Sequence, residues 1–441
     1  MHKGMKKTAA AVLLTAAISG CFWGPTQSDR PDVSTAYYDA AWLLDIYFLF
    51  RERMPADLYA YDTPVQLYRS VNEEWTVYFT KEQSLIFLSY LTTSTGGIGI
   101  YYDWTETGLR IREVFPDSPG KRAGLLAGDT IVEINQAPVS GMSLDSAGAL
   151  LRGDLGDHKY LVVLRDTGAV AIEVVLGSYL APSVFADSLD SSIAYISLTL
   201  FTSSSAYAGG SSAELRTALD RTGWAAYTIL DLRGNPGGEL GQCYDIAEEF
   251  VPAGTPVIRS EKRGIDSSYS GRNRTYFGRT ELDTHFTVNS GAALDRRIYV
   301  LVDEGTASAA EIIVSLVRDS RPDIKTVGVR TYGKGRAQVI FGIGDNNELY
   351  LADSGLAKIT YARLMPLLGA PYDSIGIVPD VVIDEGADAL DVAAGMIHAE
   401  LGTAVSKRAR TVRRLDAIRT LRREIVPAGR EPMAVEIRKQ E

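Results

Sequence analysis

The sequence predicts a multidomain α/β chain in which three residue patterns follow one another. Apolar residues recur at helical spacing over residues 34–93, short apolar runs punctuated by glycine fill 94–178, and strand-like runs alternate with helix-like ones over 179–385. Such alternation is typical of a layered α/β core with a partly parallel sheet. We therefore expect a helical N-terminal region, an inserted β-rich domain, an α/β core and, over 386–441, a helical C-terminal tail.

Composition narrows the classes of function. The chain has 441 residues, of which 46% are hydrophobic and 23% charged, the balance of an ordinary globular protein. Its formal charge is −10, and without Lys3, Lys6 and Lys7 it would be −10 minus 3, or about −13. An acidic balance of this size disfavours nucleic acid as the main partner.

The first 20 residues have the pattern of an export signal. Three lysines precede the apolar run 8–18, which is too short to span a bilayer. Ser19-Gly20-Cys21 resembles a bacterial lipobox, which implies that Cys21 is lipidated and that 21–33 is a tether. We expect an extracytoplasmic protein anchored by lipid to the bacterial cell envelope, with an ordinary cleaved signal as the alternative. No other apolar run reaches about 18 residues, so no transmembrane helix is expected.

Glycine-rich motifs mark the stretch 94–178. The segment Gly96-Gly97-Ile98-Gly99 precedes a strand, and a Ser-Pro-Gly turn at 118–120 leads to Ala-Gly-Asp at 127–129. In this combination the stretch is similar to a PDZ domain. The resemblance implies that exposed N–H groups of Gly96, Gly97, Ile98 and Gly99 hold the carboxylate of a peptide. The expected partners are protein or peptide substrates with free, apolar C-termini.

Two other stretches are defined by composition rather than by motif. From Lys407 onward, 11 Lys or Arg residues stand against 5 Asp or Glu residues. A docking or dimerising helix is the simpler interpretation, so the tail is compatible with a homo-oligomer; contact with an anionic membrane surface is the alternative. Residues 260–290 are polar with little periodicity, and we expect a long insert or a loop that faces substrate there.

The core carries a candidate nucleophile at a strand-to-helix turn. An apolar strand over 297–302 leads into Gly305-Thr306-Ala307-Ser308, and a helix with an apolar period begins directly afterwards. A serine in such a turn presents its hydroxyl beside free helix N–H groups, which stabilise negative charge. Acyl transfer needs both features.

Lysine, rather than histidine, is the expected base. Of four histidines only His285 falls in the α/β stretch, so a Ser-His-Asp triad is poorly supplied. No HExxH motif or Cys/His cluster is present, so neither a metal nor a cofactor is expected. Lys334 lies between two glycines; its amine becomes a base where burial lowers its pKa. Gln338 offers an uncharged amide to orient that amine. Taken singly, Gly-Lys-Gly is typical of an exposed turn, and Gly-Thr-Ala-Ser of tight helix packing.

Four motifs nevertheless follow one another in order: LDLRGNPGG at 230–238, GTASAAE at 305–311, TYGKG at 331–335 followed by Gln338, and GIVPD at 376–380. Together they resemble the carboxy-terminal processing proteases, the tail-specific proteases of peptidase family S41. The resemblance implies a Ser-Lys protease core with ClpP- or crotonase-like layers over 179–385. It assigns Ser308 as nucleophile, Lys334 as general base and Gln338 as the residue that positions the lysine. It also implies an oxyanion hole formed by the N–H groups of Ala309 and Gly237.

The chain departs from the family pattern in a few places. Ala310 stands where the family usually has serine, which leaves Ser308 as the only serine of the motif. Ser308 and Lys334 are 26 positions apart, one more than usual, and we place the extra residue in the turn 320–323. Val329 and Arg336 replace a glutamate and a small residue, which bears on substrate preference more than on catalysis.

We therefore expect a serine endopeptidase that cuts peptide bonds near the C-termini of extracytoplasmic proteins. The alternative is a PDZ scaffold on a degenerate protease core that retains peptides without cutting them. The intact Ser308, Lys334 and Gln338 argue against that alternative. An α/β esterase is disfavoured because Gly-x-Ser-x-Gly is absent around Ser308.

Overall fold

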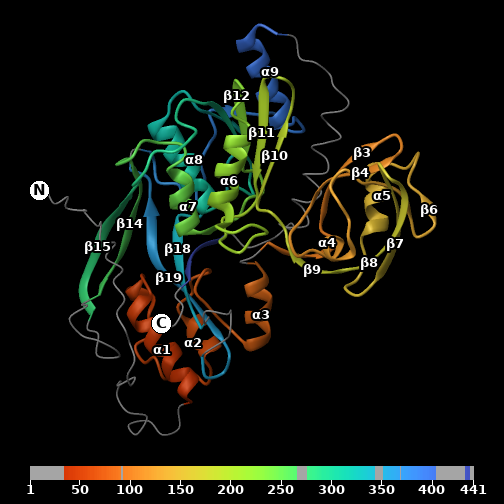
Figure 1. Ribbon diagram of the computed structural model, residues 1–441. Coiled ribbons are helices and arrows are strands. Elements are labelled where there is room, and N and C mark those ends of the chain that lie inside the picture. The colour runs from red at the N-terminus through yellow and green to blue at the C-terminus, as the bar shows by residue number, and fades with distance from the viewer. Residues whose placement is uncertain are drawn as a thin grey trace, which may run out of the picture.

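The computed structural model describes residues 34–90, 93–265, 276–342, 351–367, 369–403 and 433–437. Figure 1 shows a helical region at one end, a β-rich domain to one side and a layered α/β core between them, so the expected fold class is confirmed. Cys21 and the rest of 1–33 lie outside the described residues. In the part of the chain that is described, no helix is long and apolar enough to cross a membrane.

The N-terminal region is helical, as expected, but it is built onto a core sheet. Its elements are α1 (Thr35–Tyr47), η2 (Arg51–Arg53), α2 (Pro64–Ser70), β1 (Val77–Phe79) and α3 (Lys81–Tyr90). Strand β1 pairs antiparallel with β19 (Leu356–Met365). The apolar faces of α1 and α2 bury against β19 and against β18 (Arg336–Phe341). The helical region and the core therefore share one hydrophobic cluster.

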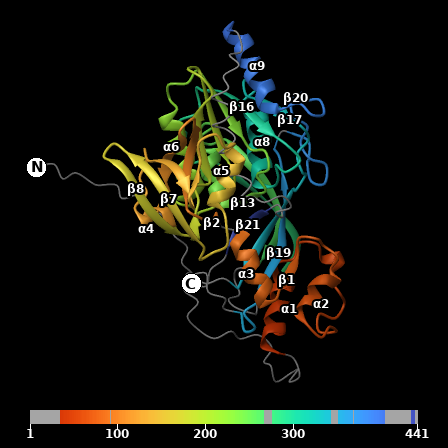
Figure 2. The ribbon, with the colours of Figure 1, turned by 90° about the vertical axis from the view of Figure 1, so that its right-hand side faces the viewer.

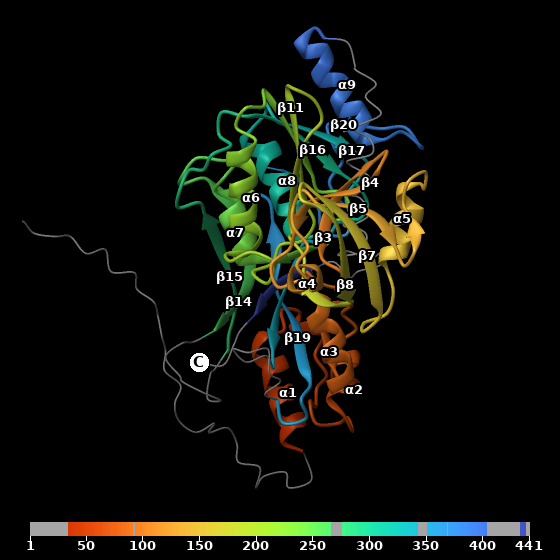
Figure 3. The same ribbon diagram turned by 45° about the vertical axis from the view of Figure 1, so that its right-hand side comes forward.

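The stretch 94–178 folds into a domain of its own, which Figure 3 shows beside the core. Its antiparallel sheet has the order β3-β4-β5-β7-β8, with β6 paired to β5 and two helices, α4 and α5. The bounds are β3 (Ile100–Thr105), β4 (Gly108–Val114), α4 (Pro119–Ala123), β5 (Thr130–Ile134), β6 (Ala137–Pro138), α5 (Leu144–Leu151), β7 (His158–Arg165) and β8 (Gly168–Val175). Strands β2 (Ser94–Gly97) and β9 (Gly177–Leu180) form a ribbon that connects this domain to the core.

The first core sheet is the one that the alternation predicts. Its order is β10-β11-β12-β16-β17-β20, and every pair from β11 to β20 is parallel. The bounds are β10 (Val184–Ser188), β11 (Ile193–Leu198), β12 (Tyr227–Asp231), β16 (Arg297–Val302), β17 (Lys325–Gly328) and β20 (Val381–Val382). Because β12 and β16 are parallel neighbours, the loops that follow them, 232–236 and 303–308, begin side by side at one edge of the sheet.

A second core sheet has the order β13-β21-β18-β19-β14-β15. Its further strands are β13 (Gly237–Glu239), β14 (Pro256–Ile265), β15 (Tyr276–Phe286) and β21 (Met433–Ile437). The helices α6 (Gly210–Arg221), α7 (Leu240–Ala247) and α8 (Ala309–Ser320) share one buried cluster with residues of both sheets, so they lie between them. Helix α9 (Ala389–Leu401) covers the outer face of the first sheet (Figure 1).

The structure differs from two expectations. The stretch 260–290, expected to be a long insert or a loop, supplies the end of β14 and all of β15, which pair antiparallel. The described side chains of β15 are mostly exposed, as on an edge strand, so no apolar run marked it. The end of the expected helical tail, 433–437, is the strand β21, because neighbouring strands on both sides supply its hydrogen bonds. Helix α9 is helical as expected, and 404–432 lie outside the described residues.

Candidate active site

Ser308 sits in a strained turn between β16 and α8. Its φ of 59° and ψ of −115° are values that residues other than glycine rarely adopt. The residue is fully buried, and its Oγ has no hydrogen-bond partner among the described residues. As the N-cap of α8 it lies where free N–H groups and the positive end of the helix dipole concentrate. A buried, unpartnered hydroxyl in a strained turn is typical of a functional group rather than of a stabilising one.

The turn that carries Ser308 is bonded to the loop that follows β12. Asp303 Oδ1 accepts the backbone N–H of Gly234 at 2.6 Å and that of Gly305 at 3.0 Å. The hydroxyl of Thr306 donates to the carbonyl of Leu232 at 2.9 Å. The hydroxyl of Thr306, the other hydroxyl of the motif, therefore holds the serine turn to the loop after β12. These bonds place the Gly-Asn-Pro-Gly-Gly loop directly beside the serine turn.

The glycine pair at the start of β13 has a backbone that only glycine fits. Gly237 has a φ of 97° and Gly238 one of 140°, and a Cβ on Gly238 would lie 2.0 Å from the carbonyl oxygen of Phe201. The N–H of Gly237 donates to Asn235 Oδ1 at 2.9 Å, so this structure does not leave it open to a substrate oxygen. Ala309 supplies the first N–H of α8, which has no acceptor within the helix. The expected oxyanion hole stays a prediction.

Lys334 is buried beside Gln338, with only 1% of its surface exposed. Its Nζ donates to Gln338 Oε1 at 2.7 Å and lies 4.6 Å from the centroid of the Trp75 ring. The lysine precedes β18 and the glutamine lies within it, so their spacing of four residues brings the two side chains together. An amide oxygen and an aromatic face thus hold the amine in a site that excludes water.

One carboxylate holds both candidate catalytic residues. Glu311 Oε2 accepts the backbone N–H of Ser308 and that of Lys334, each at 2.8 Å. Its Oε1 accepts the N–H of Gly333 at 2.7 Å and the hydroxyl of Thr331 at 2.5 Å. Burial raises the pKa of the Glu311 carboxyl, and these donors oppose the rise. Glu311 is not among the site residues expected from the sequence, although Ser-x-x-Glu before an apolar run is a capping-box signal.

A second set of bonds connects the base to the N-terminal region. Gln338 Nε2 donates to Thr360 Oγ1 at 3.1 Å, and the Thr360 hydroxyl donates to Glu73 Oε2 at 2.7 Å. Thr76 donates to the same oxygen at 2.6 Å, and Arg336 pairs with Glu73 Oε1 at 3.0 Å. Arg336, one of the departures from the family pattern, therefore anchors this network. No local signal could have found it, because its members lie far apart in the sequence.

The remaining candidates for nucleophile or base have other roles; the thiol of Cys243 donates to the carbonyl of Ala309 at 3.4 Å. His285 lies on β15 and stacks on Tyr244 with ring centroids 3.6 Å apart, and burial lowers the pKa of its imidazole. Cys243 is buried and free, and burial raises the pKa of its thiol, which makes it inert. Among the described residues, no group of His, Cys, Asp and Glu could hold a metal ion.

The glycine-rich segment of the PDZ-like domain lies at its junction with the core. Gly96 and Gly97 end β2 and pair with β9. Ile98 is buried, and Gly99 has a φ of 74°, where a Cβ would lie 2.2 Å from Cβ of Ser118. The role of these four residues in peptide binding stays a prediction.

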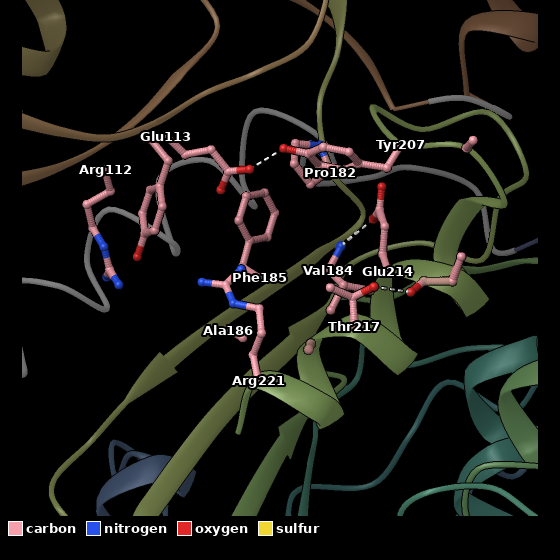
Figure 4. A pocket seen from close by; sticks show the side chains of 14 residues that line it. Arg112, Glu113, Pro182, Val184, Phe185, Ala186, Tyr207, Glu214, Thr217 and Arg221 are labelled. Atoms are coloured by element: carbon pink, nitrogen blue, oxygen red, sulfur yellow. Dashed lines mark hydrogen bonds between the residues drawn. The ribbon is translucent and has the colours of Figure 1, made fainter. Parts of the chain in front are cut away.

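A cavity of about 390 Å³ lies where this domain meets the core (Figure 4). Tyr101, Arg112 and Glu113 of β3 and β4 line one side of it, and residues of β10 and α6 line the other. Arg112 forms an ion pair with the buried Asp187, and Tyr207 donates a hydrogen bond to Glu113. The Tyr101 hydroxyl also donates to Asp187, at 3.5 Å, so polar contacts to Asp187 and to Glu113 join the domain to the core at this cavity.

Comparison with known proteins relates two parts of the chain to known families. Residues 192–383 match the model of peptidase family S41, and residues 110–165 match that of the PDZ domain. The carboxyl-terminal-processing protease of Synechocystis sp. is 33% identical over 66% of this chain and 64% of that protein. The carboxy-terminal processing protease CtpA of Bacillus subtilis is 27% identical over 71% of this chain and 61% of that protein. A solved photosystem II D1 C-terminal processing protease covers 80% of this chain and 94% of its own, with a TM-score of 0.45 and 21% identity.

The fold and the site together define a two-sheet α/β core with a buried serine and a buried lysine, joined to a PDZ domain. Over residues 192–383 the chain is similar to peptidase family S41, and the relatives it matches are named carboxy-terminal processing proteases. The matched stretches span less than two thirds of the length of the two bacterial relatives, at 64% and 61%.

Proposed function

We propose that this chain is a serine endopeptidase that cuts protein substrates near their C-termini, with Ser308 as nucleophile and Lys334 as general base. The observation that carries the proposal is the Glu311 carboxylate, one oxygen of which binds the backbone N–H groups of both residues. A domain that only retained peptides would have no use for a serine and a lysine held in this way. The intact pair, with Gln338 on the lysine, favours cleavage over the scaffold alternative.

In the proposed reaction, the neutral amine of Lys334 takes the proton of Ser308 Oγ as that oxygen attacks the scissile carbonyl carbon. The carbonyl electron pair moves onto its oxygen, which the N–H groups of Ala309 and of the glycine pair then bind. Collapse breaks the C–N bond, and Lys334 returns its proton to the leaving amine. A water molecule, deprotonated by the same amine, then hydrolyses the ester.

Two rearrangements accompany substrate binding in this proposal. Ser308 Oγ has no hydrogen-bond partner in the described part of the chain, so in this proposal its side chain turns toward Lys334 Nζ, as catalytic hydrogen bonds often tighten only with substrate present. For Gly237 to complete the oxyanion hole, the hydrogen bond from the Gly237 N–H to the Asn235 side chain must break; otherwise the N–H of Gly238 is the second donor.

We further propose that the PDZ domain binds the free C-terminus of the substrate through 96–99 and presents the chain to Ser308. The names of the relatives, C-terminal processing proteases, support this class of substrate. Lipidation of Cys21, location at the bacterial cell envelope and assembly through the tail belong to the same proposal, and no cofactor enters it.

The test compares two catalytic variants with two matched controls. Ser308→Ala and Lys334→Met should lower cleavage of an unfolded protein with an apolar C-terminus by about 10⁴-fold or more. Ser315→Ala changes another serine of α8, and Lys358→Met removes another buried lysine, whose Nζ is 6.0 Å from the Trp75 ring. Both controls should retain most activity.

Labelling with a fluorophosphonate probe separates the two candidate functions. The wild-type chain should be labelled at Ser308, and Ser308→Ala should not be labelled. A wild-type chain that binds apolar C-terminal peptides but neither cleaves them nor reacts with the probe would establish the scaffold alternative.

A further inference from the structure

The second core sheet contains a strand from the far end of the chain. Strand β21 lies between β13 and β18 and runs parallel to both. Figure 2 shows β21 close to β13. Its register places Met433 opposite Gly237 and Val435 opposite Gln338. The last strand of the chain therefore lies between the glycine pair of the proposed oxyanion hole and the strand that carries the lysine-positioning glutamine.

The two strands beside β21, β13 and β18, are also paired on their other edges. Strand β13 is held on its other edge by Phe201, whose N–H donates to the carbonyl of Gly237 at 3.0 Å and whose carbonyl accepts the N–H of Glu239 at 2.8 Å. Strand β18 is held on its other edge by β19. Removal of β21 would therefore leave a slot with an unpaired strand edge on each side. Such edges bind extended peptides through main-chain hydrogen bonds, whatever their sequence.

The segment in the slot is suited to exchange. It is a five-residue strand with three paired positions on each side, and it follows α9 only after 404–432. Its sequence, Met-Ala-Val-Glu-Ile, contains the β-branched residues that extended peptides favour.

We propose that the slot between β13 and β18 is the binding site for the substrate segment beside Ser308, and that residues 433–437 of the same chain are its resident occupant. The inference rests on the proposed function. A substrate must then displace β21 before it can pair with β13 and β18. Because a tethered segment has an effective concentration on the order of millimolar, an occupant that binds with a Kd of about 0.1 mM would raise the KM for substrate about 10-fold.

The experiment uses the full chain and three variants. One variant ends at residue 432, and Val435→Pro removes an N–H that a strand between two partners must donate. Gln440→Pro introduces the same residue beyond β21 and serves as the control. KM and kcat are measured with a peptide substrate, and the rate of fluorophosphonate labelling at Ser308 is measured in parallel.

Both β21 variants should lower KM about 10-fold with kcat retained, and Gln440→Pro should leave KM unchanged. A synthetic peptide of residues 430–441 should inhibit the shortened chain competitively. Unchanged KM in both variants would overturn the proposal. So would lost cleavage in a shortened chain that stays folded, because β21 would then be a structural strand. A KM that depends on protein concentration would also overturn it, because the tail would then act on a second copy.

If the proposed catalytic function is wrong, the experiment gives a different result. In that case neither the full chain nor any variant is labelled or cleaves the peptide. The inference is then decided by fluorescence anisotropy with the labelled 430–441 peptide. Binding to the shortened chain but not to the full chain supports the slot, and equal or absent binding overturns it.

Discussion

Replacing Glu311 with glutamine tests the link between Ser308 and Lys334 with almost no change of shape. Each carboxylate oxygen accepts two hydrogen bonds: Oε2 from the N–H groups of Ser308 and Lys334, and Oε1 from Gly333 and Thr331. Glutamine presents one oxygen and one NH₂ group, so in either orientation the NH₂ group faces two donors. The substitution therefore either separates Ser308 from Lys334 or displaces the loop that carries the lysine.

The magnitude follows from these contacts. Hydrogen bonds to a charged group contribute about 1.5–3 kcal/mol each, so two lost bonds cost about 3–6 kcal/mol. Loss of a buried charge, whose desolvation raises the pKa of Glu311, offsets part of that cost. We expect the free energy of unfolding to fall by roughly 2–3 kcal/mol. We expect kcat to fall by about 100-fold, because a displacement of about 1 Å at a catalytic group has an effect of that size.

The assay combines urea unfolding with steady-state cleavage of a peptide. Glu304→Gln, an exposed carboxylate in the same motif, is the matched control and should change neither quantity. A Glu311→Gln variant that keeps kcat within about threefold of wild type would refute the reasoning. If such a variant were also less stable, Glu311 would be important for the fold alone.

Three further predictions concern the same network. Burial raises the pKa of Glu311, so the folded chain binds a proton on this carboxyl more tightly than the unfolded chain does. Acidification through this pKa should therefore lower kcat without unfolding the chain. A loss of activity that coincides with unfolding, measured by circular dichroism, would contradict this prediction. Gln338→Glu places a carboxylate where Oε1 now lies 2.7 Å from Lys334 Nζ, which stabilises the charged amine and raises its pKa. The acid limb of the pH–rate profile should therefore move up by about 1–3 pH units. An acid limb that does not move, with Gln338→Ala measured as the control, would argue against a lysine base. Thr360→Val removes the hydroxyl between Gln338 and Glu73, and unfolding in urea should show a loss of about 1–3 kcal/mol, with no loss if the bonds contribute nothing.

Much of the fold could be predicted because its signals are local. The change from helical period to glycine-punctuated runs, and then to alternating strands and helices, marks the three parts of the chain in the order that the structure has them. The helix after Ser308 was visible from its apolar period, and it begins at Ala309. The hairpin β14–β15 and the strand β21 were missed, because exposed or inserted strands owe their conformation to distant partners.

Some residues of the candidate site could likewise be predicted from local spacing, and others could not. Lys334 and Gln338 are four positions apart, and a short spacing of this kind can be recognised along the chain. Glu311 was within reach of the sequence, since the capping box of Ser308 marks it. Glu73 was not, because its contact with Thr360 joins segments 287 positions apart.

The sequence by itself determined which groups are present: a serine at a strand-to-helix turn, a lysine between glycines, an uncharged amide beside it and no histidine motif to replace them. These are properties of residue type and short spacing. Only the tertiary structure decided that the carboxylate that caps the serine turn also binds the backbone of the lysine, and that β21 lies between β13 and β18. Both arrangements join segments that meet only after the two sheets have packed around the helices, so no short pattern along the chain encodes them.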